Sequence, residues 1–303
     1  MTMKRITAFL VAAIALIAAT SCNGGGRTSS DAAAQRRIDS LLRDVPARVG
    51  VYAQCEDRTI AVRADELFPM LSTFKVPVAI AAMQRMEREG TPLTQRIDIT
   101  PGQLLPDTYS PMRERHPDGW VGATLDSLIA YSVSMSDNNA CDILIGYAGG
   151  IDSVARCAAD ADVGPMNIEA TEDDMHRALE NQRANACTPR SAVRLLQRLE
   201  AAELLSEPYT AALIGHMTAT STGADKLRAG IPPQAVIAHK TGSSDRTPEG
   251  VKIADNDIGI VTLPDGRRYA IAVYVSDSHL DDRRNAALTA TISRIVYEAF
   301  AQP

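Results

Sequence analysis

The 303-residue chain has few of the features that mark metal-binding and nucleic-acid-binding proteins. Its five cysteines include no Cys-x-x-Cys pair and its five histidines do not cluster, so no zinc site is expected. Positive charge is in deficit, with 31 Lys and Arg against 37 Asp and Glu and a net charge of −6. This balance argues against nucleic acid or an anionic membrane surface as the main partner. No internal repeat is present either, so a repeat architecture is not expected.

A hydrophobic run long enough to span a bilayer is also missing. Residues 1–21 begin with two basic residues and continue with an apolar segment, which is the pattern of a signal peptide and is too short for a transmembrane helix. Loss of this segment would make the net charge more negative by two. Cys22 follows it as in a bacterial lipoprotein processing site, and the Gly- and Ser-rich residues 22–30 predict a flexible tether. Two interpretations remain open: Cys22 is lipidated, or the segment is an ordinary signal peptide followed by a chance cysteine. Both predict an exported, periplasmic protein. Contact with the membrane is expected only if Cys22 carries a lipid.

The four remaining cysteines are even in number: Cys55, Cys141, Cys157 and Cys187. In an exported protein such a number permits disulfides. Buried free thiols fit equally well, since 45% of the residues are hydrophobic and provide for a large core. The sequence leaves the two possibilities open.

Hydrophobic periodicity predicts an α/β (α+β) fold. Apolar residues at helical spacing indicate amphipathic helices over residues 31–45 and 285–300. Two pairs of strand-like runs, each pair separated by a turn, cover residues 49–54 and 59–63, and residues 258–263 and 269–275. The segment between them, about 70–217, has mostly helical patterns. The simplest architecture is an antiparallel sheet built from both ends of the chain, flanked by the terminal helices, with an all-helical subdomain inserted.

The first chemical signal is Ser72-Thr73-Phe74-Lys75, where strand-like sequence changes to a helical pattern. Residues three apart share a helix face, so the Lys75 nitrogen can reach the Ser72 hydroxyl and take its proton. The helix N-terminus would favour developing negative charge. A Ser-x-x-Lys motif is nevertheless expected about once by chance in a chain of this length. A capping serine followed by a solvated lysine is the alternative.

The second signal is Ser136-Asp137-Asn138, which opens another predicted helix. Ser136 can pass a proton to a leaving nitrogen. The Asn138 amide can bind a substrate carbonyl while it accepts a hydrogen bond from Lys75. The alternative is a capping sequence, because Ser, Asp and Asn are the preferred caps.

The third signal is Lys240-Thr241-Gly242, directly after an apolar run that predicts a strand. The Thr241 and Ser243 hydroxyls, together with the Lys240 charge, can hold a carboxylate, and Gly242 allows a ligand to approach the backbone. A lysine on a sheet edge is the alternative. Three such motifs in this order are far less expected by chance than any one of them.

Together the three motifs resemble those of the class A serine β-lactamases. Residues 136–142 (SDNNACD) and 238–242 (AHKTG) are similar to the cephalosporinase and extended-spectrum branch of that family. The resemblance runs over residues 31–303 and implies a site at the seam between two subdomains. These are an α/β subdomain of residues 31–68 and 218–303 and a helical subdomain of residues 69–217.

The resemblance also implies a deacylating glutamate at Glu172, seventeen residues before Pro189. By composition alone a surface carboxylate is the alternative, because Glu172 lies in an acidic cluster. His176 stands where many relatives have asparagine, so an imidazole would be the second partner of the catalytic water. Ala170 and Asn185 stand where an Arg–Asp ion pair often bridges this loop. Their presence predicts a looser or differently folded loop, with access for bulky oxyimino substrates.

Three further residues are implied to contact substrate. Tyr109 matches an aromatic residue at the entrance of the site, although buried packing is equally compatible with its type. Thr222 and Lys226 fall where this branch usually offers an arginine to the substrate carboxylate. Lys226 is the weaker candidate, because lysine lacks the bidentate fork of arginine.

The implied activity is hydrolysis of cephalosporins and penicillins through an acyl-enzyme on Ser72, which gives antibiotic resistance. The backbone N–H groups of Ser72 and Ser243 would form the oxyanion hole, Ser136 would protonate the leaving nitrogen and Glu172 would activate water. Whether Lys75 or Glu172 is the acylation base stays open. A monomer that uses a β-lactam, a catalytic water and no metal or organic cofactor is expected. A penicillin-binding D,D-peptidase and a β-lactam sensor that does not turn over are the alternatives.

Overall fold

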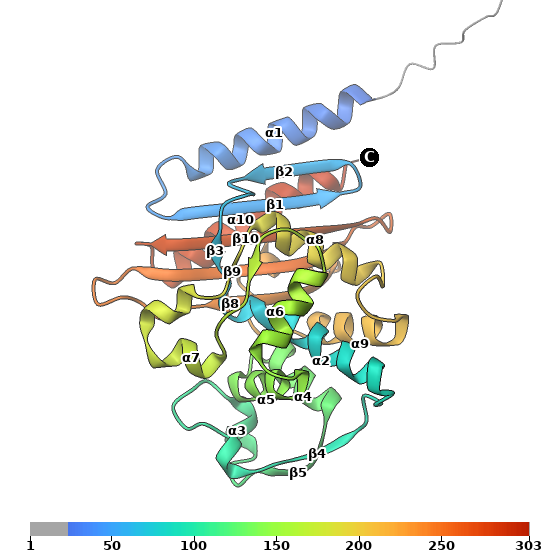
Figure 1. Cartoon of the computed structure of the whole chain (residues 1–303). Coiled ribbons are helices and arrows are strands. Elements are labelled where there is room, and N and C mark those ends of the chain that lie inside the picture. Colours follow the sequence, from blue (N-terminus) through green and yellow to red (C-terminus); the bar gives the residue numbers. More distant parts are fainter. Residues whose placement is uncertain (1–23, 303) are drawn as a thin grey trace, which may run out of the picture.

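The computed structural model describes residues 24–302 and is built around a five-stranded antiparallel sheet (Figure 1). Its strands lie in the order β2-β1-β10-β9-β8. Their bounds are β1 Arg48–Cys55, β2 Arg58–Val62, β8 Val236–Ser243, β9 Lys252–Thr262 and β10 Arg268–Ser278. Because β1 lies between β2 and β10, the first strands of the chain pair with the last one, with Val51 opposite Val273. The prediction of an antiparallel sheet built from both ends of the chain is confirmed.

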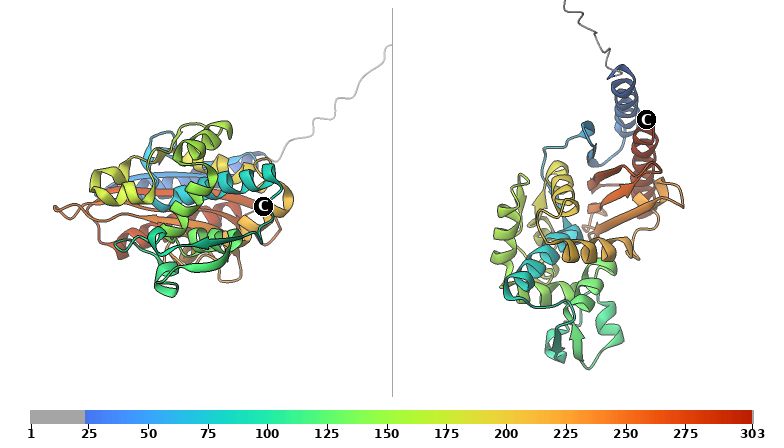
Figure 2. Two further views of the ribbon diagram at one scale, coloured as in Figure 1. Left: turned by 60° about the horizontal axis from the view of Figure 1, so that its bottom comes forward. Right: turned by 90° about the vertical axis from the view of Figure 1, so that its right-hand side faces the viewer.

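Side chains of β1 alternate between two apolar layers, as a strand buried on both faces requires. Val49, Val51 and Ala53 pack with the terminal helices α1 (Gly24–Leu42) and α10 (Asp282–Phe300). Tyr52 belongs to the other layer, which continues into the helical part of the molecule. Figure 2 shows α1 and α10 lying close together near the C-terminus. The terminal helices therefore flank the sheet as predicted.

Helix α1 starts earlier than predicted. It begins at Gly24, so residues 24–30 are helical where a flexible tether was predicted, and the tether prediction is corrected to that extent. The segment contains no proline that would break a helix, and it runs on toward the end of α10, where Ser30 Oγ donates to Gln302 Oε1 at 3.1 Å. Cys22 and the signal peptide over residues 1–21 lie outside the described residues.

Residues 75–218 form most of the described helices, and Figure 1 draws those from α2 to α5 below the sheet and α8 beside it. They are α2 Lys75–Glu89, α3 Pro111–Arg115, α4 Leu125–Ser134, α5 Asn138–Ala148, α6 Ile151–Asp160, α7 Glu172–Arg177, α8 Pro189–Glu200 and α9 Glu207–Thr218. Helix α2 is the centre of this part, and its apolar side chains from Val76 to Met86 are almost all buried. Helix α8 lies against β1 and β10 and so connects the helical part to the sheet.

The inserted part is not all-helical, which corrects the prediction for residues 69–217. Strands β4 (Arg96–Ile99) and β5 (Trp120–Thr124) form an antiparallel pair. The short strands β3 (Phe68–Pro69), β7 (Ala186–Cys187) and β6 (Met166–Asn167) form a second small sheet. These strands have two to five residues, which is too few for an alternating pattern to stand out in the sequence.

The four cysteines of the described chain are free thiols, which settles the question that the sequence left open. Cys55, Cys141 and Cys187 are buried, and burial raises the pKa of the Cys187 thiol to about 12. A thiol with such a pKa is a poor nucleophile. Over residues 24–302, none of the helices combines the length and the apolarity needed to cross a membrane.

Candidate active site

Ser72 lies on a strained turn that leads into α2. The turn is the 3₁₀ helix η1 (Leu71–Phe74), and Leu71 has a φ of 45°, which is unusual for a branched residue. Two hydrogen bonds to the Met70 carbonyl oxygen stabilise the turn. Thr73 Oγ1 donates to it at 2.8 Å and the buried Asn256 Nδ2 at 3.1 Å. Strain maintained in this way is common where a reactive side chain has to be presented.

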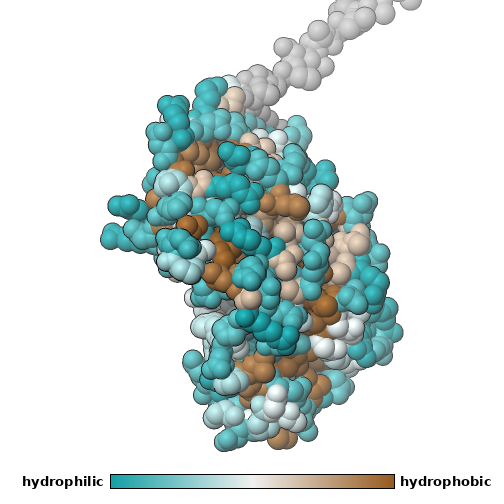
Figure 3. Space-filling model, turned by 60° about the vertical axis from the view of Figure 1, so that its left-hand side comes forward, coloured by the Kyte–Doolittle hydropathy of each residue, from teal (hydrophilic) through white to brown (hydrophobic). Residues whose placement is uncertain are grey.

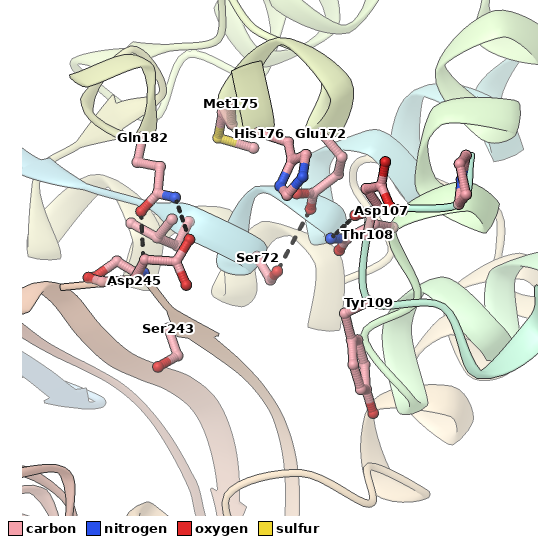
Figure 4. Close-up of a pocket in the computed structure, with 14 residues that line it drawn as sticks. Ser72, Asp107, Thr108, Tyr109, Glu172, Met175, His176, Gln182, Ser243 and Asp245 are labelled. Atoms are coloured by element: carbon pink, nitrogen blue, oxygen red, sulfur yellow. Dashed lines mark hydrogen bonds between the residues drawn. The ribbon is translucent and has the colours of Figure 1, made fainter. Parts of the chain in front are cut away.

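Gly242 brings strand β8 against this turn. A Cβ atom at Gly242 would lie 2.6 Å from the Met70 carbonyl oxygen and 3.1 Å from the Ser72 nitrogen, so no other residue fits without displacement. Ser243, the next residue, lines the same cleft as Ser72 (Figure 4). The two predicted oxyanion donors are therefore on adjoining walls of one cleft.

Lys75 is fully buried, so it is not the solvated lysine of the alternative interpretation. Its Nζ donates to Ser136 O and to Asn138 Oδ1, both at 2.6 Å, and lies 2.9 Å from Glu172 Oε1. The same carboxylate oxygen accepts from Ser72 Oγ at 3.5 Å. Glu172 thus stands between Ser72 and Lys75, where the sequence predicted a direct contact.

Ser136 lies between two lysines. Lys240 Nζ donates to Ser136 Oγ at 2.8 Å, and Lys75 Nζ is 3.5 Å from the same oxygen. Ser136 has a φ of 60° and does not cap α5; Asp137 does so, accepting from Ala140 N at 2.8 Å. Lys240 is fully buried rather than exposed on an edge, and this burial, together with the charge of Lys75, holds the pKa of Lys240 well below its usual value.

Asp142 fixes the backbone at Glu172. The Asp142 carboxylate accepts from the Glu172 N–H at 2.8 Å and from the Asp173 N–H at 2.9 Å, which is the favoured place for an acidic group at the start of a helix. Burial raises the pKa of Asp142 to about 7. The sequence analysis missed this role, although Asp142 lies four residues after Asn138 and so on the same face of α5.

The loop before α7 is held without an ion pair. Asn185 is fully buried; its Oδ1 accepts from the Glu169 N–H at 2.8 Å and from the Ala170 N–H at 2.9 Å, and its Nδ2 donates to Ala170 O at 2.8 Å. A carboxamide offers both a donor and acceptors, so the backbone alone satisfies it. The prediction of a looser loop is corrected: Ala170 and Asn185 make no ion pair, but Asn185 holds the backbone on both sides of Ala170.

The cleft around Ser72 has a volume of about 400 Å³. It is lined by residues from both subdomains: Ser72, Thr108, Tyr109, Asn138, Glu172, Met175, His176, Gln182, Ser243 and Asp245. Tyr109 is 57% exposed at the rim rather than packed in the core, and His176 is exposed beside Glu172 (Figure 4). Sequence reasoning had not included Gln182 and Asp245, which carry no motif of their own.

Thr222 and Lys226 have different surroundings. Thr222 Oγ1 is hydrogen-bonded to Thr241 Oγ1 at 2.6 Å, so both hydroxyls lie beside the Lys240 motif. Lys226 is buried, and its ammonium is paired with Asp255 Oδ1 at 2.5 Å. Lys226 does not line the Ser72 cleft, but its Cδ and Thr241 Cγ2 both lie next to Gly223, so it is a neighbour of the Lys240 motif whose charge is held by Asp255.

A serine hydroxyl next to a carboxylate, with two buried lysines around a second serine, is the kind of site found in enzymes that transfer acyl groups through a serine. The chain is similar over residues 33–300 to the model of the β-lactamase enzyme family. It belongs to that family, in the class A group of enzymes that hydrolyse β-lactams.

Individual relatives agree with this assignment. A β-lactamase of Bacteroides uniformis is 43% identical over 88% of this chain and 90% of its own length. β-Lactamase VEB-1 of Pseudomonas aeruginosa is 33% identical over 87% of this chain and 89% of its own. The solved structure of a class A β-lactamase from Bacteroides cellulosilyticus has 42% identity and a TM-score of 0.88, over 90% of this chain and 99% of that one.

Proposed function

We propose that the chain opens β-lactam rings by forming an acyl-enzyme on Ser72 and releases the product with water activated by Glu172. The observation that carries the proposal is the position of Glu172 Oε1, 3.5 Å from Ser72 Oγ and 2.9 Å from Lys75 Nζ. A penicillin-binding D,D-peptidase or a sensor would lack this deacylating carboxylate. The presence of Glu172 therefore favours a hydrolase that turns over.

In the acylation step Ser72 Oγ attacks the lactam carbonyl carbon while its proton passes to Glu172 or Lys75, which are in contact with each other. The oxyanion is stabilised by the Ser72 and Ser243 backbone N–H groups, a contribution of several kcal/mol. The lactam C–N bond then breaks. Ser136 gives its proton to the departing nitrogen and takes up in turn the proton that left Ser72, passed on through Lys75, so that Glu172 is a carboxylate again when deacylation begins.

In the deacylation step Glu172 takes a proton from a water molecule in the cleft, and the resulting hydroxide attacks the ester carbonyl. The C–O bond to Ser72 breaks and the serine recovers its proton. His176 and Asn138 line the cleft beside Glu172 and are suitable partners for this water. The product leaves as the ring-opened acid.

The substrate carboxylate is proposed to meet Thr241, Ser243 and the charge of Lys240, with Thr222 beside them. Lys226 contributes less to this site than an arginine would, because its charge is already paired with Asp255. Tyr109 at the rim can pack against the substrate side chain. Relatives that carry the name extended-spectrum β-lactamase, such as PER-1 and TLA-3, support cephalosporins as well as penicillins as substrates and resistance as the outcome.

Export to the periplasm is part of the proposal. Residues 1–21 have the composition of a signal peptide, and Cys22 is a site for a lipid anchor. Mass spectrometry of the native N-terminus tests this: a lipidated Cys22 supports anchoring, an unmodified N-terminus after residue 21 supports a free periplasmic enzyme, and an intact Met1 contradicts export.

We also propose a monomer, since on the face in Figure 3 apolar side chains form separate patches among hydrophilic ones.

Turnover of a chromogenic cephalosporin by the purified protein tests the proposed function. Sustained hydrolysis of many equivalents per chain, abolished by Ser72→Ala, is expected. A single burst of one product per chain would instead make the protein a sensor or a penicillin-binding protein.

A further inference from the structure

Three buried hydroxyl and thiol groups form a chain beside the turn that carries Ser72, and the mechanism gives them no role. They belong to Thr73 in η1, Tyr274 in β10 and Cys187 in β7. Thr73 Oγ1 lies 3.4 Å from Tyr274 Oη, and Cys187 Sγ lies 3.2 Å from the same oxygen. All three side chains are fully buried, so each of these polar hydrogens needs a partner inside the protein. We call the three residues the Tyr274 chain.

The direction of the hydrogen bonds in the Tyr274 chain follows from the Met70 carbonyl oxygen at its end. That oxygen can only accept, so the one hydroxyl hydrogen of Thr73 is used in the 2.8 Å bond to it. Tyr274 then donates to Thr73, and Cys187 donates to Tyr274. Burial keeps both donors protonated, because it raises the pKa of Tyr274 well above its usual value and the pKa of Cys187 to about 12.

The bond from Thr73 to Met70 closes the turn around Ser72, since one of its partners precedes Ser72 and the other follows it. Between them Leu71 has a φ of 45°, a strained value that persists only where the surroundings fix it. A change at Leu71 would move the Ser72 side chain and its N–H together. It would also move them relative to Gly242, whose backbone lies close to the Met70 oxygen and the Ser72 nitrogen.

Tyr274 is itself held by packing. It lies opposite Gly50 in the pairing of β1 with β10, and a Cβ atom at Gly50 would lie 2.4 Å from the Phe68 ring. Because Gly50 has no side chain, the Phe68 ring can lie against Tyr274, with the ring centroids 5.9 Å apart. Phe68 also pairs with Cys187, the third member of the chain, between β3 and β7. Thr73 therefore has a partner that is fixed by the sheet.

We propose that Tyr274 is a positioning residue for the nucleophile. Its hydroxyl holds Thr73 and so keeps the turn in the conformation that presents Ser72 Oγ and the Ser72 N–H to the substrate carbonyl. The inference rests on the proposed function, which uses both of these groups. Tyr274 is fully buried and does not line the Ser72 cleft, so it acts through Thr73 and Met70. A small displacement of a reacting group is enough to lower the rate.

The test measures the inhibition constant Ki of phenylboronic acid, whose boron binds a serine oxygen reversibly and becomes tetrahedral, like the carbon in the transition state. Ki does not depend on the fraction of folded enzyme, so a loss of stability alone does not change it. Tyr274→Phe removes the hydroxyl and keeps the ring. Tyr269→Phe is the matched control on the same strand, because Tyr269 is also buried but its hydroxyl has no hydrogen-bond partner among the described residues.

Ki is expected to rise about fivefold in Tyr274→Phe, which is the size of effect of one lost hydrogen bond, and to stay within about twofold of wild type in Tyr269→Phe. Thr73→Val lacks the hydroxyl at a similar volume and should raise Ki at least as much. Thr73→Ser retains the hydroxyl and should stay close to wild type. The double variant Thr73→Val/Tyr274→Phe should have the Ki of Thr73→Val alone, because Tyr274 acts through the Thr73 hydroxyl.

An unchanged Ki in Tyr274→Phe overturns the positioning role, even if the variant unfolds more easily. Additive effects in the double variant overturn it as well, because Tyr274 would then act by another route. If Tyr274→Phe does not fold, equal Ki values for Thr73→Val and Thr73→Ser overturn the proposal. Failure of the proposed function is distinct from these results, since the wild-type protein would then neither bind phenylboronic acid at Ser72 nor hydrolyse a β-lactam.

Discussion

At the scale of single residues, the site depends on two lysines and a glutamate that share a small buried volume. Lys240 and Lys75 both approach Ser136 Oγ, at 2.8 Å and 3.5 Å, while Glu172 lies against Lys75. Burial, together with the charge of Lys75, holds the pKa of Lys240 well below its usual value of 10.5. We therefore propose that loss of the Lys240 charge limits binding of the substrate carboxylate at alkaline pH.

The Lys240→Arg substitution tests this. As the pH rises through the lowered pKa, Lys240 loses its proton and its attraction for the substrate carboxylate, so kcat/KM of the wild-type enzyme should fall on an alkaline limb below pH 10.5. An arginine stays charged over that range. The alkaline limb of kcat/KM should move to higher pH in Lys240→Arg, even if the maximum is lower. Identical alkaline limbs in the two proteins would remove Lys240 as the titrating group.

Residue types and spacing could single out Ser72, Ser136 and Lys240, because each belongs to a short sequence motif, and Ser136 and Lys240 are in contact in the structure. The same reasoning could not predict Asp142 or Asn256, whose partners are backbone groups from other segments. For Lys226 the sequence suggested a role but could not show the partner of its charge. Its position in the sequence suggested a substrate contact, but its carboxylate partner, Asp255, lies on a strand and has no sequence motif.

At the scale of elements, the loop before α7 decides how well Glu172 is held. Asn185 contributes three hydrogen bonds to the backbone at Glu169 and Ala170. Sequence comparison by residue type showed only that an ion pair was missing. It could not show that one amide side chain satisfies the same backbone, because that depends on the path of the loop.

We expect Asn185→Ala to lower the free energy of unfolding by about 2–3 kcal/mol, since each lost hydrogen bond contributes about 1 kcal/mol. Deacylation should slow as well, so that acyl-enzyme accumulates during turnover. Urea unfolding and quenched-flow mass spectrometry measure the two effects. Asn167→Ala, at an exposed residue on the neighbouring strand β6, is the matched control and should change neither. A stable Asn185→Ala protein with wild-type deacylation would contradict the role of Asn185.

At the scale of the whole molecule, the two ends of the chain are joined at Arg58. This side chain is 4% exposed; it donates to Asp31 Oδ1 in α1 at 2.7 Å and to Ala299 O in α10 at 2.7 Å. Helices from both termini are thus fixed to β2. The sequence predicted both helices and the sheet, but the strand order joins segments more than 200 residues apart, which local patterns do not encode.

Arg58→Ala should lower the free energy of unfolding by about 3–5 kcal/mol, because it leaves the Asp31 carboxylate, which is 16% exposed, and the carbonyl groups of Ala299 and Gln302 without their partner. The exposed pair Arg37–Glu298 joins the same two helices, so Arg37→Ala is the matched control, with a loss of about 0–1 kcal/mol. Thermal and urea unfolding measure both, and kcat/KM of the folded protein should stay at the wild-type value in each. Equal losses in the two variants would contradict the role given to the buried arginine.

The central claim is that Ser72 carries the acyl group and Glu172 removes it. Mass spectrometry of Glu172→Gln mixed with benzylpenicillin tests it most directly, because glutamine nearly matches the shape of glutamate but cannot take a proton from water. The expected result is one intact penicillin bound covalently per chain, located on Ser72 by peptide mapping, while the wild-type enzyme turns over without accumulating the adduct. Wild-type turnover by Glu172→Gln, or an adduct on another residue, would contradict the account.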